Sequence, residues 1–374
     1  MDRRNPRGTL TGGQGSDRPA RQALIVGVVL RLSRESTLAG CSQERLAEAL
    51  GISVDTVAGW ESGRRPLSAV KAGQFVLLKS TLIRLGAAPD LIRLLDVAME
   101  ADQILDHTRV VADRHDRGDF HPLGAYVHRR EVIELVAWPL SGRMPQAIPA
   151  VPERRRGPAP AGPELSNQER SQVYDHLRRV VETSRGADGL LYRQAVYLQS
   201  YDRRDDAREW MAEQYRQLPP PCSGWSPQWP AVRTLAASLV RYGEPNQLID
   251  FSQYGLADDA GHTANLNYWA YWVGESVTIE PDDSFMPQLL GPWRGERILR
   301  HLASRLDEAD GVADLGIHTL RTLLAARPQL LNEDSDLIGA LGSTVGRLMD
   351  AGRMSPNARQ ALAEVHFALR LHTR

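Results

Sequence analysis

Basic residues are concentrated in the first part of the chain, where they could bind a polyanion. Residues 1–85 carry 13 Lys and Arg against 7 Asp and Glu, whereas residues 86–374 carry 32 against 39. The whole chain of 374 residues has a net charge of −1, so this positive excess is local. The charge balance therefore suggests that the N-terminal end faces a negatively charged partner, with chance variation between domains as the alternative.

Between residues 42 and 65, small polar residues, apolar residues and glycines follow the spacing of two short helices. Ser42 can cap the first helix, and Gly51 supplies the left-handed backbone that ends it. Ser53 can cap the second helix, which Gly63 ends. The apolar positions are Leu46, Ala47 and Leu50 in the first helix and Val57 and Trp60 in the second. Two short helices joined by a tight, glycine-containing turn form a helix-turn-helix.

The order of these residues resembles the Xre/Cro-type helix-turn-helix family of phage and bacterial repressors. The resemblance covers about residues 22–85 and is carried by Ser42-Gln43, Leu46-Ala47, Leu50-Gly51-Ile52-Ser53 and Trp60-Glu61-Ser62-Gly63. It implies that the residues that contact double-stranded DNA are Gln43, Ser53, Val54, Asp55, Thr56, Gly59, Arg64 and Arg65. It also implies a partly buried ion pair between Arg34 and Glu61. The residues that hold the motif in shape would be Arg34, Leu46, Ala47, Gly51, Val57, Trp60 and Glu61.

The expected recognition helix lacks the side chains that most often read bases. Its exposed face carries no Arg, Asn or Gln, which make the usual two-bond contacts with guanine and adenine. Val54 can contact a thymine methyl group, Thr56 can bond a base or a phosphate, and Asp55 can accept from cytosine but repels phosphate. We therefore expect sequence selection to depend also on DNA shape or on an N-terminal arm in the minor groove.

Composition and periodicity divide the chain into five parts and predict an all-α protein. Residues 1–20 are expected to be a disordered arm, and residues 21–86 the helix-turn-helix domain. Residues 87–141 are predicted to be a helical connector, with a long amphipathic helix at residues 90–113 and a second helix ended by Pro139. Residues 142–165, rich in Pro and Arg, are expected to be a linker. Residues 166–374 are predicted to form about ten helices, as a tetratricopeptide-like repeat or an irregular bundle.

Two groups of residues outside the motif are candidates for binding. His107, His115, His121 and His128 lie close together, but their irregular spacing favours a solvated loop over a metal site. Aromatic residues in the C-terminal part are expected to pack between helices, with an effector pocket as the alternative. The pocket residues would be Asn265, Tyr268, Trp269 and Trp272, with Asn267 as a second polar candidate. No phosphate-binding loop or hydrolase motif is present in the sequence, and we expect no metal and no cofactor.

These observations predict a cytoplasmic, sequence-specific DNA-binding transcriptional regulator and not an enzyme. The C-terminal helical domain would tune operator binding through a small-molecule, peptide or protein effector. The long apolar stretch at residues 90–113 suggests a homodimer, and the short apolar runs indicate no membrane association. The main alternative is a protein-interaction scaffold whose helix-turn-helix does not read DNA. An enzyme that uses the histidine group is a weaker alternative.

Overall fold

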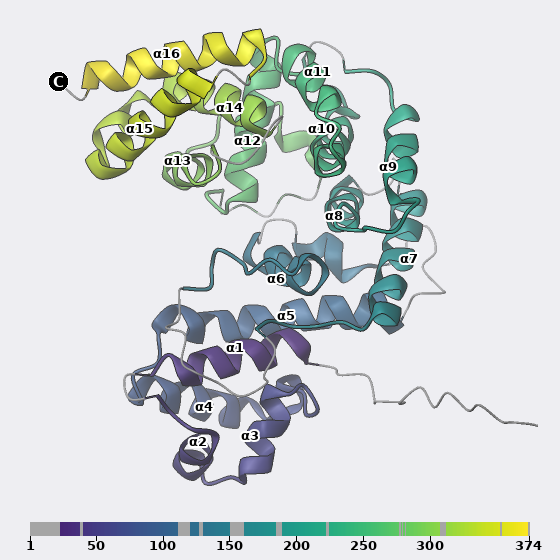
Figure 1. The fold of residues 1–374 in the computed structure, drawn as a ribbon, viewed down its shortest axis with the longest axis vertical. Coiled ribbons are helices and arrows are strands. Elements are labelled where there is room, and N and C mark those ends of the chain that lie inside the picture. Colours follow the sequence, from purple (N-terminus) through teal and green to yellow (C-terminus); the bar gives the residue numbers. More distant parts are fainter. Residues whose placement is uncertain are drawn as a thin grey trace, which may run out of the picture.

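The protein is helical throughout the part of the chain that the structure describes. The computed structural model describes residues 23–372, apart from 38–39, 111–119, 127–129, 150–160, 185–188, 222–223, 277, 279, 281, 307–311 and 352–353. Within these residues there are sixteen α-helices and no strand, which confirms the all-α prediction. Figure 1 shows α2 and α3 at one end of the molecule and α13 to α16 at the other. The expected N-terminal arm, residues 1–20, lies outside the described residues.

Six helices form the N-terminal half. They are α1 (Leu24–Glu35), α2 (Gln43–Leu50), α3 (Val54–Glu61), α4 (Ala72–Arg84), α5 (Pro89–Val110) and α6 (Arg130–Ser141). Helix α5 lies along α1 and also contacts α4, α6 and α7. Helices α2 and α3 pack against each other at the outer end of this group (Figure 1).

The ends of α2 and α3 form where the sequence predicts them. The Ser42 hydroxyl accepts a hydrogen bond from the Arg45 N–H at 3.2 Å, and the Ser53 hydroxyl accepts one from the Thr56 N–H at 3.2 Å. Gly51 ends α2 with φ +67°, a left-handed conformation that costs a glycine little. Each cap satisfies a backbone donor that the first turn of a helix leaves free, so these short helices start at defined residues.

A glycine in α1 allows α3 to approach closely. A Cβ atom on Gly27 would lie 2.7 Å from the Glu61 carbonyl oxygen and 2.8 Å from that of Trp60. These are backbone atoms at the end of α3, and they cannot move away as a flexible side chain would. The position therefore requires glycine because the two helix backbones meet there.

Helix α5 is buried within the chain on its apolar side. Its residues Leu91, Leu94, Leu95, Ala98, Ile104 and Leu105 are at most 1% exposed. One continuous cluster of buried apolar residues runs from Ala23 in front of α1 to Trp272. The expected boundary near residue 87 is therefore not a break in the core. The apolar stretch that suggested a homodimer is covered by α1, α6 and α7 of the same chain.

The chain around Pro139 and the expected linker differs from the sequence prediction. Pro139 lies inside α6, which continues to Ser141 before Gly142 ends it with φ +69°. Proline is tolerated there because only the last turn loses a hydrogen bond. The described ends of the linker are not solvated throughout, since Ile148 and Leu165 are each 6% exposed. Its run of Arg154 to Arg156 lies outside the described residues.

Among the described residues, ten α-helices follow the linker, where the sequence predicted about ten. They are α7 (Asn167–Ser184), α8 (Gly189–Gln199), α9 (Ala207–Arg216), α10 (Trp229–Leu239), α11 (Asn246–Tyr254), α12 (Asp259–Trp272), α13 (Glu296–Ala303), α14 (Val312–Ala326), α15 (Ser335–Ala351) and α16 (Pro356–His372). Helices near in sequence pack on one another: α7 on α8, α8 and α9 on α10, α10 on α11, and α15 on α16.

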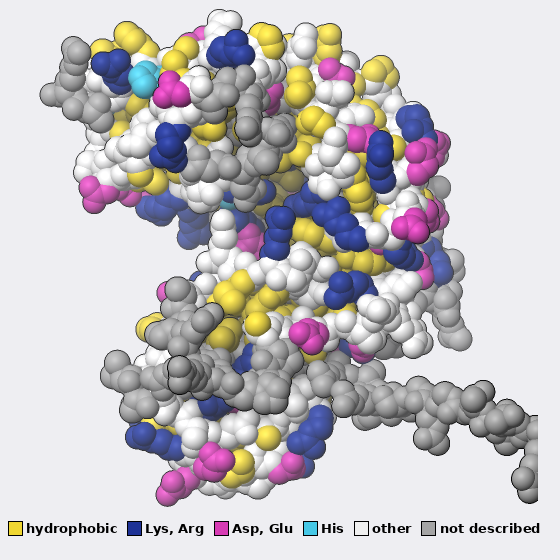
Figure 2. All heavy atoms as spheres, in the orientation of Figure 1, with side chains coloured by type: hydrophobic (Ala, Val, Ile, Leu, Met, Phe, Trp, Pro, Cys, Tyr) yellow, Lys and Arg dark blue, Asp and Glu magenta, His cyan; other side chains and the backbone are white. Residues whose placement is uncertain are grey.

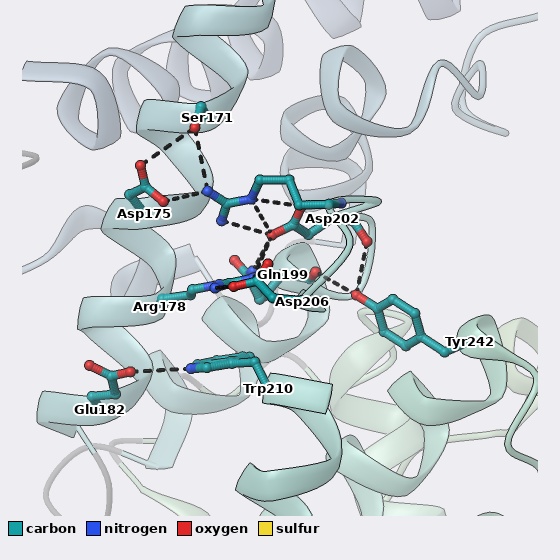
Figure 3. Close-up of polar contacts among 10 residues, drawn as sticks. Ser171, Asp175, Arg178, Glu182, Gln199, Asp202, Asp206, Trp210 and Tyr242 are labelled. Atoms are coloured by element: carbon teal, nitrogen blue, oxygen red, sulfur yellow. Dashed lines mark hydrogen bonds and ion pairs between the residues drawn. The ribbon is translucent and has the colours of Figure 1, made fainter. Parts of the chain in front are cut away.

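A buried carboxylate joins the first three of these helices. The Asp202 side chain is fully buried and accepts hydrogen bonds from Arg178 at 3.2 Å and from the Arg204 Nε at 2.9 Å. The Tyr242 hydroxyl donates to the carbonyl oxygens of Gln199 and Asp202, as Figure 3 shows. The charge of Asp202 is thus balanced by two arginines, and the network fixes the turn between α8 and α9 against α7.

Asp102 on α5 caps α1 from a distance of 77 residues in the sequence. Its two carboxylate oxygens accept hydrogen bonds from the Ile25 and Val26 N–H groups, each at 2.8 Å. No side chain near α1 caps that helix end. Burial raises the pKa of the Asp102 carboxyl to about 8, although the two backbone N–H groups act to lower it. The α1–α5 contact therefore contains a titratable group at the N-terminal end of α1.

We expect wild-type protein to lose stability relative to Asp102→Asn as the pH rises from about 5 to about 8. In the unfolded chain the carboxyl loses its proton near a pKa of about 3.9, whereas in the folded chain it holds the proton until about pH 8. Unfolding within this window therefore releases a proton, and raising the pH favours it. Urea unfolding of both proteins across the window measures the difference, and parallel pH profiles would contradict the expectation.

Candidate nucleic-acid interface and ligand cavity

The N-terminus of α3 presents a short polar and apolar surface to solvent. Ser53, Val54 and Asp55 are all exposed, with Val54 at 38%. Thr56 is half-buried, and its hydroxyl lies 2.9 Å from that of Ser53. The free N–H groups of a helix N-terminus attract anions, so this surface suits contact with DNA.

Asp55 is paired with both arginines that follow α3. Arg64 donates to one carboxylate oxygen at 3.0 Å, and Arg65 donates to the other at 2.8 Å. The hydrogen bond from Arg64 and the charge of Arg65 hold the pKa of Asp55 below its usual range. All three side chains are more than half exposed, so water and salt weaken these pairs. Both arginines can therefore exchange Asp55 for a phosphate.

Gly59 is buried, whereas the sequence predicted that it lies on the exposed face of α3. A Cβ atom there would lie 3.0 Å from the Arg65 Cδ atom, so the arginine stem covers this position. The Arg65 N–H donates to the Gly59 carbonyl at 3.0 Å, and its guanidinium donates to the Thr56 hydroxyl at 2.9 Å. Gly59 thus provides space for Arg65 and is not a surface for a base.

The predicted pair of Arg34 and Glu61 is present and fixes α3 against α1. Arg34 donates through Nε to Oε1 at 2.6 Å and through Nη2 to Oε2 at 2.9 Å. A third donor, Nη1, reaches the Cys41 carbonyl at 2.7 Å. Burial acts to lower the pKa of Arg34, but the hydrogen bond and charge of Glu61 outweigh it, so the pKa is raised. The guanidinium therefore joins α1, α3 and the chain before α2.

Gln43 also bonds Glu61, which differs from the role that the resemblance implies. Its side-chain N–H donates to the Glu61 Oε2 atom at 2.7 Å. Because this carboxylate oxygen also accepts from Arg34, Gln43 completes a three-residue network inside the motif. In this arrangement Gln43 fixes the start of α2 relative to the end of α3.

A cavity of about 390 Å³ lies between α6 and the helices of the C-terminal half. Three of the four expected pocket residues, Tyr268, Trp269 and Trp272, line it. The sequence analysis did not identify the arginines on α8 and α10 that line the same cavity, Arg193 and Arg233. Each is the only charged residue of its helix, a pattern that can indicate a buried charge.

The two asparagines expected as polar groups of the pocket have structural roles. Asn265 is 1% exposed, accepts from the Arg233 Nε at 3.3 Å and donates to the Thr319 hydroxyl at 2.8 Å. Asn267 donates to the carbonyls of Met286 and Gln288. Neither side chain lines the cavity, because both are used to tie α12 to neighbouring segments.

The histidines form a cluster that differs from the one considered from the sequence. His107 and His121 lie with ring centres 4.8 Å apart, and His176 from α7 joins them. The Leu123 N–H donates to His121 Nδ1, so His121 holds its proton on Nε2, which lies 3.0 Å from the His176 Nε2. His115 and His128 are outside the described residues. Among the residues that are described, no group of His, Cys, Asp and Glu is arranged to hold a metal ion.

We expect Arg34→Ala to lower the free energy of unfolding by about 3–5 kcal/mol, because it leaves the Glu61 charge buried without its main partner. Arg34→Lys should lose less, since it keeps the charge but not the two parallel hydrogen bonds. Chemical denaturation of the full-length variants measures both effects. The matched control is Arg216→Ala on α9, an exposed arginine paired with Glu209 and Glu213. Equal stability of Arg34→Ala and the control would contradict the role of the pair.

In a comparison with known protein families, a family model described as a helix-turn-helix matches residues 30–72. The match spans the second half of α1, all of α2 and α3, and the start of α4. Searches of curated proteins and of solved structures found no match. In the described part of the chain, no helix is long and apolar enough to cross a membrane. At the level of the family, the helix-turn-helix match supports a DNA-binding regulator.

Proposed function

We propose that the protein is a sequence-specific transcriptional regulator that binds double-stranded DNA through α2 and α3. The observation that carries this proposal is the capped, exposed N-terminus of α3 within a helix-turn-helix that the Arg34–Glu61 pair locks. Val54 and Thr56 are the side chains proposed to face bases, and Arg64 and Arg65 those proposed to face phosphates. The C-terminal helices are proposed to tune this binding when an effector occupies the cavity lined by Tyr268, Trp269 and Trp272.

The second candidate function is a scaffold whose helix-turn-helix binds protein and not DNA. The observation that favours it is the pairing of Asp55 with Arg64 and Arg65, which reduces the positive charge of the surface. The two functions differ in their response to salt. Binding to DNA releases counterions and weakens steeply with salt, whereas a protein contact of mixed character does not.

Arg64→Ala and Arg65→Ala should each weaken binding to duplex DNA about tenfold and reduce the slope of log affinity against log salt by about 1. Arg64→Ala removes one proposed phosphate contact and leaves the contacts of the base-facing side chains in place. Arg65→Ala also removes the hydrogen bond to the Thr56 hydroxyl. The duplex is first enriched from a random-sequence pool by the wild-type protein, and affinity is then measured by fluorescence anisotropy at several salt concentrations.

Two matched controls accompany this measurement. Asp55→Asn frees both arginines and should bind DNA at least as tightly as wild type, and Arg216→Ala on α9 should leave binding unchanged. Failure of the wild-type protein to enrich any sequence, together with a salt-independent interaction, would favour the scaffold.

We also propose that the regulator binds DNA as a homodimer. Two copies of a helix-turn-helix can occupy half-sites about 34 Å apart, and linking them multiplies a weak single contact. Since the apolar face of α5 is covered, α4 is the helix proposed to meet a second copy. Val76, Leu77 and Ile83 on α4 are large apolar side chains at 58%, 46% and 60% exposure. Val76 and Ile83 are seven residues apart and therefore lie on one side of the helix.

Ile83→Glu should convert the DNA-bound dimer into a monomer and weaken operator binding about 100-fold. A charge on this surface would have to be desolvated when two copies meet. Sedimentation of the full chain with and without the selected duplex measures the mass, and anisotropy measures the affinity. Phe367→Glu on α16, which replaces another exposed apolar residue, is the control. A wild-type protein that binds the duplex as a monomer would rule out the dimer.

A further inference from the structure

The cavity between the two halves of the molecule is unusually rich in arginine. Its wall contains residues from α6, α8, α10, α12 and α14. Among the described residues, the lining includes one acidic side chain, Glu134, and six arginines: Arg130, Arg143, Arg193, Arg233, Arg241 and Arg305. Figure 2 shows Lys and Arg side chains gathered beside hydrophobic ones in the hollow between the halves. The charge of this wall is therefore strongly positive.

Two of the arginines have carboxylate partners beside the cavity. Arg130 is paired with Glu134 one turn along α6, and Arg193 is paired with Asp283 at 2.6 Å. These pairs neutralise part of the charge and hold the two guanidinium groups in place. Neither pair involves Arg233 or Arg241.

Arg233 is a buried cation without an acidic partner in the described part of the chain. Arg233 is only 4% exposed, and its Nη2 atom has no hydrogen-bond partner among the described residues. The guanidinium lies 3.9 Å from the ring centre of Tyr268 and 5.0 Å from that of Trp269. Burial lowers the pKa of Arg233, which is the effect of a positive charge removed from water. The described side chains around Arg233 therefore leave its buried positive charge without a negative counterpart.

Arg241 adds a second cation held by neutral groups. Its guanidinium lies 4.4 Å from the ring centre of Tyr201 and 5.1 Å from that of Tyr197. It donates to the Ser200 hydroxyl at 2.9 Å and to the Tyr201 hydroxyl at 3.1 Å. Among the described residues it forms no ion pair, so its charge is also available to a ligand.

The wall also carries aromatic and aliphatic side chains, beside the polar side chains of Gln194, Thr234 and Ser238. Tyr268, Trp269 and Trp272 of α12 face a cavity that Leu248 and Leu315 also line. Aromatic rings and aliphatic side chains bind planar apolar groups, whereas guanidinium groups bind carboxylates and phosphates. The volume of about 390 Å³ lies within the range of small-molecule sites.

We propose that this cavity binds a small organic anion, a carboxylate or phosphate joined to a planar apolar body. Arg233 provides the principal contact with the anion, Asn265 orients Arg233, and Arg241 provides a second contact. The aromatic side chains of α12 hold the apolar body. Binding of the anion does not depend on the proposed function; only its role as the effector that tunes DNA binding rests on that function.

Contacts along the chain connect the cavity with the helix-turn-helix. Helix α6 forms one wall and packs on α5, and Asp102 of α5 caps α1. Arg130 at the start of α6 also bonds His301 of α13 at 2.6 Å, so α6 is held from both sides. A ligand that draws the arginines into the cavity would shift α6. Because α6 packs on α5 and α5 packs on α1, the shift can reach α1, which carries Arg34.

The first experiment measures ligand binding alone, by calorimetry on the full-length protein. The probes are 1-naphthoate and 1-naphthyl phosphate, their uncharged analogue 1-naphthamide, inorganic phosphate, and an acidic hexapeptide of glutamate. We expect one of the two naphthyl anions to bind with a stoichiometry of one and at least about tenfold more tightly than the amide, a difference of ~1.4 kcal/mol. The better of the two identifies carboxylate or phosphate as the preferred group.

Variants locate the binding. Arg233→Met should weaken binding of the naphthyl anion at least about tenfold and leave binding of 1-naphthamide unchanged. Arg241→Gln should also weaken binding of the naphthyl anion. Because Arg241 is less buried than Arg233, this variant still tests the site if Arg233→Met does not fold. Arg216→Met on α9 is the matched control, and circular dichroism establishes that each variant is folded. Equal binding of amide and anion, no effect of both cavity variants, or preference for the hexapeptide would each overturn the proposal.

The second experiment separates ligand binding from regulation. The affinity for the selected duplex is measured with and without a saturating naphthyl anion, for wild type and Arg233→Met. A change in wild type alone supports the effector role. Anion binding that leaves DNA affinity unchanged refutes the coupling but not the site, and DNA binding without any anion binding refutes the site but not the proposed function.

Discussion

The helix-turn-helix depends on one buried guanidinium. Arg34 lies near the end of α1, and Glu61 is the last residue of α3. The two side chains therefore form their ion pair only when α1 and α3 pack together. The two parallel hydrogen bonds fix the rotation of α3 as well as its distance, which a single apolar contact would not. Gly27 allows the close approach of the helices that places both groups within reach. The surface that α3 presents is thus set by an interaction on its opposite side.

The N-terminal and C-terminal halves are mechanically continuous. The apolar core runs without a break from α1 through α5 and α6 to α8, although the composition suggested a connector and a linker there. Two polar contacts reinforce this continuity, from Asp102 to the start of α1 and from Arg130 to His301. Because packed helices shift as units, this arrangement gives an event in the cavity a physical route to the helix-turn-helix.

Arginine has contrasting surroundings in the helix-turn-helix and in the cavity between the two halves. Arg64 and Arg65 are more than half exposed, and their pairs with Asp55 are weakened by water and salt, so they can exchange partners. Arg233 is buried against two aromatic rings, where its charge is poorly compensated. The same side chain is therefore proposed as an adaptable phosphate contact at one site and as a selective anion contact at the other.

The sequence by itself determined the local features of the protein. The caps at Ser42 and Ser53, the turn at Gly51 and the helical class follow from nearest neighbours, and the family pattern indicated the Arg34–Glu61 pair. Only the tertiary structure decided the rest. In the folded chain the Arg65 side chain covers Gly59, and neighbouring helices cover the apolar face of α5. The side chains of Asn265 and Asn267 bond neighbouring segments, and Arg193 and Arg233 line one cavity. Asp102 and Val26 are 76 residues apart, and such contacts arise from packing between distant helices, which local spacing does not encode.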